Sequence, residues 1–140
     1  MSGTRTYGVW SDWLEGRVLG NAFLGESNAM PAAVYVALFR TPPTDLVPGE
    51  EPTNAARYTR LLVTLERTAE GDDGSTLLWN VAALQWPMAA MPWGTLSHVG
   101  LFDAAIFGNY LAWAPMETPR TVNVGDAVRF DANTLLLGLR

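Results

Sequence analysis

The 140-residue sequence contains no cysteine and no lysine, and His98 is its only histidine. The lack of cysteine excludes disulfides, thiolate metal sites and cysteine nucleophiles, so packing alone must hold the fold together. All nine basic residues are arginine, and fourteen acidic residues leave a net charge of -5. Nucleic acid is not an expected partner, because binding to a phosphate backbone needs clustered positive charge.

Long hydrophobic runs are also absent. No window approaches the roughly 18 apolar residues of a membrane span, and the N-terminal segment MSGTRTYG lacks the apolar core of a signal peptide. We therefore expect no membrane partner, and the cytoplasm as the default location. Charged residues make up only 16 % of the chain, against 49 % hydrophobic residues. This low charge density predicts that a partner covers part of the apolar surface.

The segment 93–115, WGTLSHVGLFDAAIFGNYLAWAP, brings the single histidine close to an acidic residue in the sequence. On a strand over residues 96–102, His98 would share a face with Leu96. Asp103 would then lie on the opposite face and about 15 Å along the strand, beyond any hydrogen bond. We therefore expect a hairpin with His98 in a strand and Asp103 in the turn, and no catalytic dyad.

Other candidate catalytic or metal-binding groups are weak. No serine lies in a Gly-x-Ser-x-Gly motif, and the segment EGDDGS lacks the alternating oxygen ligands of a calcium loop. The carboxylate pairs Glu50 with Glu51 and Asp72 with Asp73 lie in loops rich in glycine or proline, where neither burial nor a fixed separation is expected. The sequence thus predicts a protein that is not an enzyme and that has no cofactor and no metal site.

Residues 11–25 form the one predicted helix. Ser11 can cap its start, acidic residues occupy its first turn, and Gly25 can end it. Gly16 and Gly20 lie inside the helix, and each costs about 1 kcal/mol relative to alanine. We therefore expect a docked helix that depends on tertiary packing.

After Pro31 the chain consists of short apolar runs separated by glycine, proline, asparagine and aspartate, a pattern typical of antiparallel sandwiches and barrels. We predict a mainly β fold, a jelly-roll or β-sandwich of two antiparallel sheets with one short N-terminal helix. The segment 33–39 is apolar on both faces and should be a central strand. The other expected strands are 58–67, 76–81, 82–86, 96–102, 109–114, 120–124, 127–131 and 134–139.

The expected organisation is a single domain over residues 1–140. It comprises an N-terminal arm at 1–10, the helix at 11–25 and the β-sandwich at 33–139. The segment 40–56 contains four prolines and no periodicity. It therefore predicts an exposed loop of a length that is typical of functional or disordered segments.

Tryptophan and methionine are abundant, and the core should absorb about four of the six tryptophans. The segment QWPMAAMPWG, residues 85–94, is broken by proline and is difficult to pack as a regular strand. Aromatic residues and methionine are enriched where proteins bind one another. Both a core role and an intersubunit contact remain open for this segment.

Nearly the whole chain resembles a family of small virion proteins of tailed phages, often labelled tail-fibre proteins. The matching segments are WSDWLEGRVLGNAF, VYVALFRTPPTD, YTRLLVTL, LQWPMAAMPWGTLSHVGLFDAAIFGNYLAWAPMETPRTVNVGDAVRF and NTLLLGL. The stretch from Trp93 to Phe130 is the most specific. The family's small turn ATGGN is replaced here by AIFGN, so that Ile106 and Phe107 are expected at a hairpin tip.

The resemblance implies a jelly-roll or sandwich module, similar to the capsid cement proteins that sit on the outer surface of the phage head. It implies the major capsid protein as partner, and self-association as a dimer more than as a trimer. The first hypothesis is thus a cement or decoration protein, the second a tail-fibre or baseplate adhesion module, and the third a small sugar-active enzyme. The residues expected to contact a partner or a second copy are Trp10, Trp13, Met88, Met91, Trp93, Ile106 and Phe107.

Overall fold

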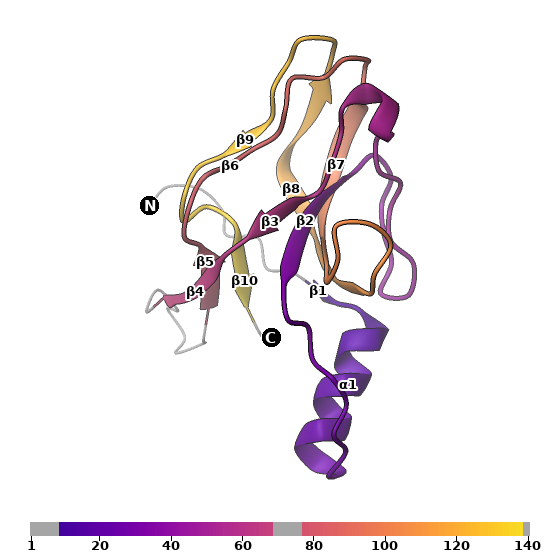
Figure 1. Cartoon of the computed structure of the whole chain (residues 1–140), viewed down its shortest axis with the longest axis vertical. Helices are drawn as coiled ribbons and strands as arrows, with labels where there is room; N and C mark the ends of the chain where they lie inside the picture. The colour runs from indigo at the N-terminus through magenta and orange to yellow at the C-terminus, as the bar shows by residue number, and fades with distance from the viewer. Residues whose placement is uncertain (1–8, 69–76, 139–140) are drawn as a thin grey trace.

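The structure is a computed structural model, and it describes residues 9–68 and 77–138 (Figure 1). The chain is mainly β with antiparallel sheets and one helix, consistent with a β-sandwich, so the predicted fold class is confirmed. In chain order the described elements are β1 (Val9–Trp10), α1 (Asp12–Phe23), β2 (Val34–Phe39), the short 3-10 helix η1 (Asn54–Ala56), β3 (Leu61–Val63), β4 (Leu65–Thr68), β5 (Leu77–Asn80), β6 (Leu84–Gln85), β7 (Gly94–Phe102), β8 (Tyr110–Val122), β9 (Arg129–Phe130) and β10 (Leu136–Gly138).

The described strands form three hydrogen-bonded groups, where the sequence predicted two sheets. A main sheet has the order β1-β8-β7-β2-β3, a small sheet has the order β10-β5-β4, and β6 pairs with β9 in a two-stranded ribbon. The predicted strand 58–67 is divided, because β3 pairs with β2 whereas β4 pairs with β5. One continuous apolar pattern thus supplies strands to two sheets.

Strand β8 unites two predicted strands, 109–114 and 120–124, in one long element. It contains Pro115, which lacks an N–H and is disfavoured inside a sheet. Strand β1 pairs with β8 only at Ala112 and Trp113. After Trp113, β7 is the only described strand that pairs with β8. The edge of β8 that faces away from β7 therefore has no described hydrogen-bond ladder for Pro115 to interrupt.

Strand β2 is covered on both faces, as its pattern predicted. The face of the main sheet that bears Val36 and Leu38 is called the inner face. These two side chains lie in the main core, together with residues of the ribbon and of segment 86–93. The outer face bears a second cluster formed by Ala37, Phe39, Phe102 and Tyr110. The Phe39 and Phe102 rings meet edge to face, with centroids 6.2 Å apart.

The loop after β2 packs over this outer cluster at Gly49, while most of its residues are exposed as predicted. The Tyr110 hydroxyl donates to the Thr44 carbonyl oxygen at 2.9 Å, and Trp113 Nε1 donates to Asp45 Oδ1 at 3.2 Å. These contacts attach the loop to the first half of β8. The part of the predicted exposed loop near residues 44–45 is thus a cover for the outer face of the main sheet.

The helix begins as predicted. Ser11 is its N-cap and accepts a hydrogen bond from the Leu14 amide at 3.2 Å, while the Ser11 hydroxyl donates to the Tyr110 carbonyl oxygen. The second half differs from the docked helix that we expected, because it projects away from the sheets (Figure 1). It is held by the segment that follows it, for example through the Asn21 and Asn28 side-chain and backbone bonds.

Of the predicted N-terminal arm, residues 1–8 lie outside the described residues. Val9 and Trp10 are the part that is described, and they form β1, an edge strand of the main sheet.

Alanine at two glycines should have opposite effects on stability. A methyl group at Gly100 would overlap the Phe39 ring in the outer cluster, so Gly100→Ala should lower the free energy of unfolding by about 1–3 kcal/mol. At Gly16 the added methyl meets no atom within 4 Å, and Gly16→Ala should raise that free energy by about 1 kcal/mol through helix propensity. Urea denaturation of both variants measures the difference, and equal effects would contradict this packing.

Candidate functional site

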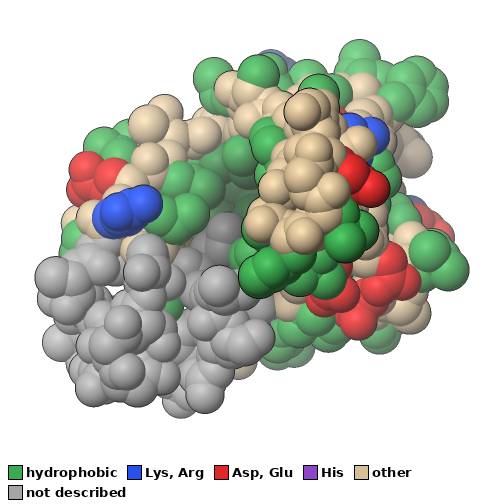
Figure 2. Space-filling model, turned by 90° about the horizontal axis from the view of Figure 1, so that it is seen from below, with side chains coloured by type: hydrophobic (Ala, Val, Ile, Leu, Met, Phe, Trp, Pro, Cys, Tyr) green, Lys and Arg blue, Asp and Glu red, His purple; other side chains and the backbone are tan. Residues whose placement is uncertain are grey.

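Large apolar side chains are exposed at the end of α1, on the loops over the outer face of the main sheet, and in segment 85–94. Figure 2 looks at the molecule from the helix end and shows hydrophobic side chains over much of this face, with acidic side chains between them. Such surfaces typically mark contacts with other proteins. In the described part of the chain, the exposed large apolar residues are Val9, Leu19, Phe23, Leu24, Met30, Leu46, Val47, Leu62, Val81, Met88, Met91, Ile106, Phe107 and Val124.

Segment 85–94 divides its large side chains between the core and the surface. Met88 and Met91 are exposed, as an intersubunit contact requires. Trp93 is fully buried, so the expectation that it contacts a partner is corrected. Its Nε1 donates to the Ala56 carbonyl oxygen at 2.9 Å, and its ring meets the Tyr58 ring edge to face. The side chain is thus committed to the core.

Trp10 and Trp13, the other tryptophans expected at an interface, are half-buried. Trp10 lies in β1 opposite Ala112 of β8. Trp13 packs against the main core, and the Arg17 guanidinium lies 4.7 Å from the centre of its ring. Both keep some exposed surface, and their contact with a partner stays a prediction.

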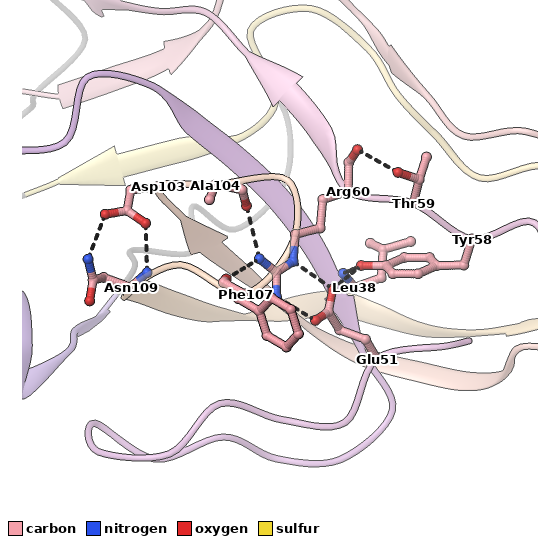
Figure 3. Close-up of polar contacts among 9 residues, drawn as sticks. All are labelled: Leu38, Glu51, Tyr58, Thr59, Arg60, Asp103, Ala104, Phe107 and Asn109. Carbon is pink, nitrogen blue, oxygen red and sulfur yellow. Dashed lines mark hydrogen bonds and ion pairs between the residues drawn. The ribbon is translucent and has the colours of Figure 1, made fainter. Parts of the chain in front are cut away.

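The loop between β7 and β8, residues 103–109, is the hairpin turn that the sequence predicted. The Asp103 carboxylate accepts from the Asn109 amide at 2.6 Å and from Asn109 Nδ2 at 2.9 Å, which closes the loop at its base (Figure 3). Ile106 and Phe107 are 68 % and 86 % exposed. Phe107 has a φ of 56°, a left-handed conformation that costs a non-glycine residue energy.

Arg60 binds the backbone of this loop. Its Nη1 donates to the carbonyl oxygens of Ala104 at 2.9 Å and Phe107 at 2.7 Å (Figure 3). The guanidinium carbon also lies 3.6 Å from the centre of the Phe102 ring. Nε and Nη2 donate to the two oxygens of Glu51 at 3.0 and 2.9 Å, so the pair is bidentate. Arg60 therefore joins the loop after β2 to the loop after β7.

This network corrects one expectation about the acidic loop residues. The Glu51 carboxylate has a fixed position, because it binds Arg60 and accepts from the Tyr58 hydroxyl at 2.6 Å. Neighbouring Glu50 pairs with a different arginine, Arg40. The second acidic pair, Asp72 with Asp73, lies outside the described residues. Sequence patterns gave no signal for the Arg60 network, because its members are separated along the chain by loops.

Burial and the negative charge of Glu51 raise the pKa of Tyr58, which therefore stays a neutral hydrogen-bond donor. Burial, together with the charge of Asp45, likewise raises the pKa of Tyr110. Both hydroxyl groups already have backbone or carboxylate partners. They stabilise the loops over the outer face and are not poised for proton transfer.

His98 and Asp103 do not form a pair, as predicted. The His98 ring lies beside Trp113, and its Nδ1 is 2.8 Å from Ser97 Oγ. Burial lowers the pKa of His98, which favours the neutral imidazole. A bulge in the pairing between β7 and β8 lies between Leu96 and His98. It sends Leu96 into the main core, so the predicted shared face of these two residues is wrong.

Two further results concern the described residues alone. Within 9–68 and 77–138, no group of three or more histidine, cysteine, aspartate or glutamate side chains could hold a metal ion. The helix in this part of the chain is neither long nor apolar enough to cross a membrane.

Comparison with known proteins gives one family. The family model described as Podophage GP4 fiber I protein gp80 matches residues 9–138, which include every described strand and the helix. The comparison with curated proteins gave no match. The chain therefore belongs to the Gp80 family, and it is a phage structural protein.

Proposed function

We propose that this chain is a capsid cement protein, a non-enzymatic component of the outer head surface that clamps neighbouring major capsid proteins. The observation that supports this role best is the set of exposed large apolar side chains, which occur both on loops and at the helix end. Side chains such as Phe107 and Phe23, 86 % and 79 % exposed, are unfavourable in water and favour burial against another protein.

The mechanism rests on buried area and on repetition. A contact of ordinary size buries about 800 Å² on each partner. Repeated over a shell, many such contacts resist expansion although no single one is strong. Self-association as a dimer would let one cement unit hold two capsid sites, and Met88 and Met91 are exposed and suited to such a contact.

Heating particles assembled with and without this protein tests the proposal. Particles that lack it should release their genome at a temperature several degrees lower, and purified protein added back should restore the difference. An unrelated apolar protein at the same concentration is the control for unspecific coating. Equal release temperatures would contradict the cement function.

A second candidate, a tail-fibre or baseplate adhesion module, is favoured by the printed description of the family as a fiber protein. The same exposed apolar surface would then dock the module to the tail. The two candidates differ in location and copy number, which labelling of intact particles separates. Many copies on the head support cement, and a few copies at the tail support adhesion.

A further inference from the structure

We infer that the loop at residues 103–109 is a preformed apolar anchor, fixed by Arg60, that inserts into an apolar pocket with a basic rim on a neighbouring virion protein. The inference rests on the proposed structural role in the virion, and it assigns both the attachment element and the chemistry of its partner. It does not require that the partner be on the head.

The first support is the contrast between the tip and its base. Ile106 and Phe107 are largely exposed, yet the backbone of their loop is bound to Arg60 through the carbonyl oxygens of Ala104 and Phe107. The Arg60 side chain is only 9 % exposed. A loop without a binding role gains little from presenting phenylalanine in a left-handed conformation. Holding the two side chains in place before binding lowers the entropy lost on association.

The second support is the adjacent loop, which adds more apolar surface. Leu46 and Val47 are 74 % and 56 % exposed, and the same loop is attached to the start of β8 by the bond from Tyr110 to Thr44. Arg60 and Glu51 join this loop to the anchor loop (Figure 3). The two loops therefore form one connected surface over the outer face of the main sheet.

The charge beside this surface defines the partner. Asp45 lies next to Leu46, and its carbonyl oxygen accepts from the amide of Asp12, another exposed acidic residue. The positive charge of Arg60 is paired with Glu51 and is largely buried, so it does not balance these acidic groups at the surface. A second copy using the same patch would bring acidic groups together, since a two-fold contact pairs each surface with itself. An apolar pocket on a partner protein, bordered by arginine or lysine, would complement both the apolar side chains and the acidic groups beside them.

Binding of purified protein to particles assembled without it tests the anchor, measured by co-sedimentation. Phe107→Ser should weaken binding about tenfold or more, as expected of an aromatic anchor, with no change in melting temperature because the side chain is exposed. Val81→Ser, at an apolar residue 43 % exposed between β5 and β6 and away from the main sheet, is the control and should bind as the wild type does. Asp45→Asn should bind less tightly and with a smaller dependence on salt.

Arg60→Lys tests the positioning role, because lysine keeps the charge but lacks the fork that bonds Glu51 and the loop carbonyls together. Amide hydrogen exchange in residues 104–109 of the isolated protein should become faster, and binding should weaken, while exchange in β2 and β7 stays slow. Unchanged exchange in the loop would overturn the positioning role.

The outcomes separate the anchor from the proposed function. If the wild type binds particles and Phe107→Ser binds equally well, the anchor is wrong and the structural role in the virion stands. If Phe107→Ser instead abolishes self-association of the free protein, the occupant is a second copy and the basic pocket is wrong. If the wild type binds no particle, both proposals fail.

Discussion

Trp93→Ala is expected to lower the free energy of unfolding by about 3–5 kcal/mol, the usual cost of removing a large aromatic side chain from a packed core. Trp93 is fully buried and belongs to the main core, at the end of the segment that precedes β7. The substitution leaves a cavity beside Tyr58, and it also removes the donor that bonds the Ala56 carbonyl oxygen. For a domain stabilised by about 5–15 kcal/mol, this loss is a large fraction of the total.

Met91→Ala is the matched control, because Met91 lies two residues away in the same proline-broken segment and is 51 % exposed. We expect a change of less than about 0.5 kcal/mol there. Urea denaturation followed by far-ultraviolet circular dichroism measures both variants without relying on tryptophan fluorescence. Similar losses for Trp93→Ala and Met91→Ala would mean that segment 85–94 is not divided between core and surface as described.

Arg60→Met is expected to lower the free energy of unfolding by about 3 kcal/mol, because removing one partner leaves the other charge partly buried without compensation. The Arg60 and Glu51 side chains are 9 % and 22 % exposed, so solvent screens this pair only weakly. The substitution also removes the donor to two loop carbonyl groups. The destabilisation should therefore exceed that of an ordinary surface ion pair, which contributes at most about 1 kcal/mol.

The double variant Arg60→Met with Glu51→Gln distinguishes charge from packing. Glutamine keeps an oxygen that accepts from the Tyr58 hydroxyl, but it carries no charge that needs Arg60. The double variant should therefore be more stable than Arg60→Met alone, by about 1 kcal/mol. Should Arg60→Met cost less than about 0.5 kcal/mol, the pair would be an ordinary surface contact and Arg60 would not hold the loop.

The sequence predicted those elements whose signals are local. The apolar run 33–39 contains the central strand β2. Because side chains of a strand alternate between its two faces, an uninterrupted apolar run has to be buried on both faces of the sheet. Ser11 became the N-cap, since a serine oxygen satisfies a free amide at the helix start. The turn at 103–109 followed from its aspartate, glycine and asparagine.

Features that depend on contacts between distant residues were missed. The strand predicted over 58–67 supplies two sheets, because partner strands and not the local pattern decide where a ladder ends. The bulge beside His98 shifts the alternation, so Leu96 enters the core. The bond between Arg60 and the carbonyl oxygen of Phe107 spans 47 residues, and no spacing rule anticipates it.

The residues expected at an interface also divide into those whose exposure local patterns indicate and those whose position depends on the fold. Ile106, Phe107, Met88 and Met91 are exposed, and the turn or proline-broken segments that carry them were a signal for that exposure. Their contact with a partner stays a prediction. Trp93 belongs to the same segment, yet it is buried, because composition does not reveal which side of an irregular segment faces the core. The loop that carries the exposed Leu46 and Val47 is joined to the anchor loop only in the fold, through Arg60 and Glu51.

An image reconstruction of the intact particle at side-chain resolution tests the central claim most directly, namely that this chain attaches to other virion proteins through its outward apolar side chains. We predict density for the protein on the head, with Phe107 enclosed by a neighbouring subunit that places basic side chains near Asp45. Density in which Phe107 and the other exposed apolar residues all face solvent would contradict the account.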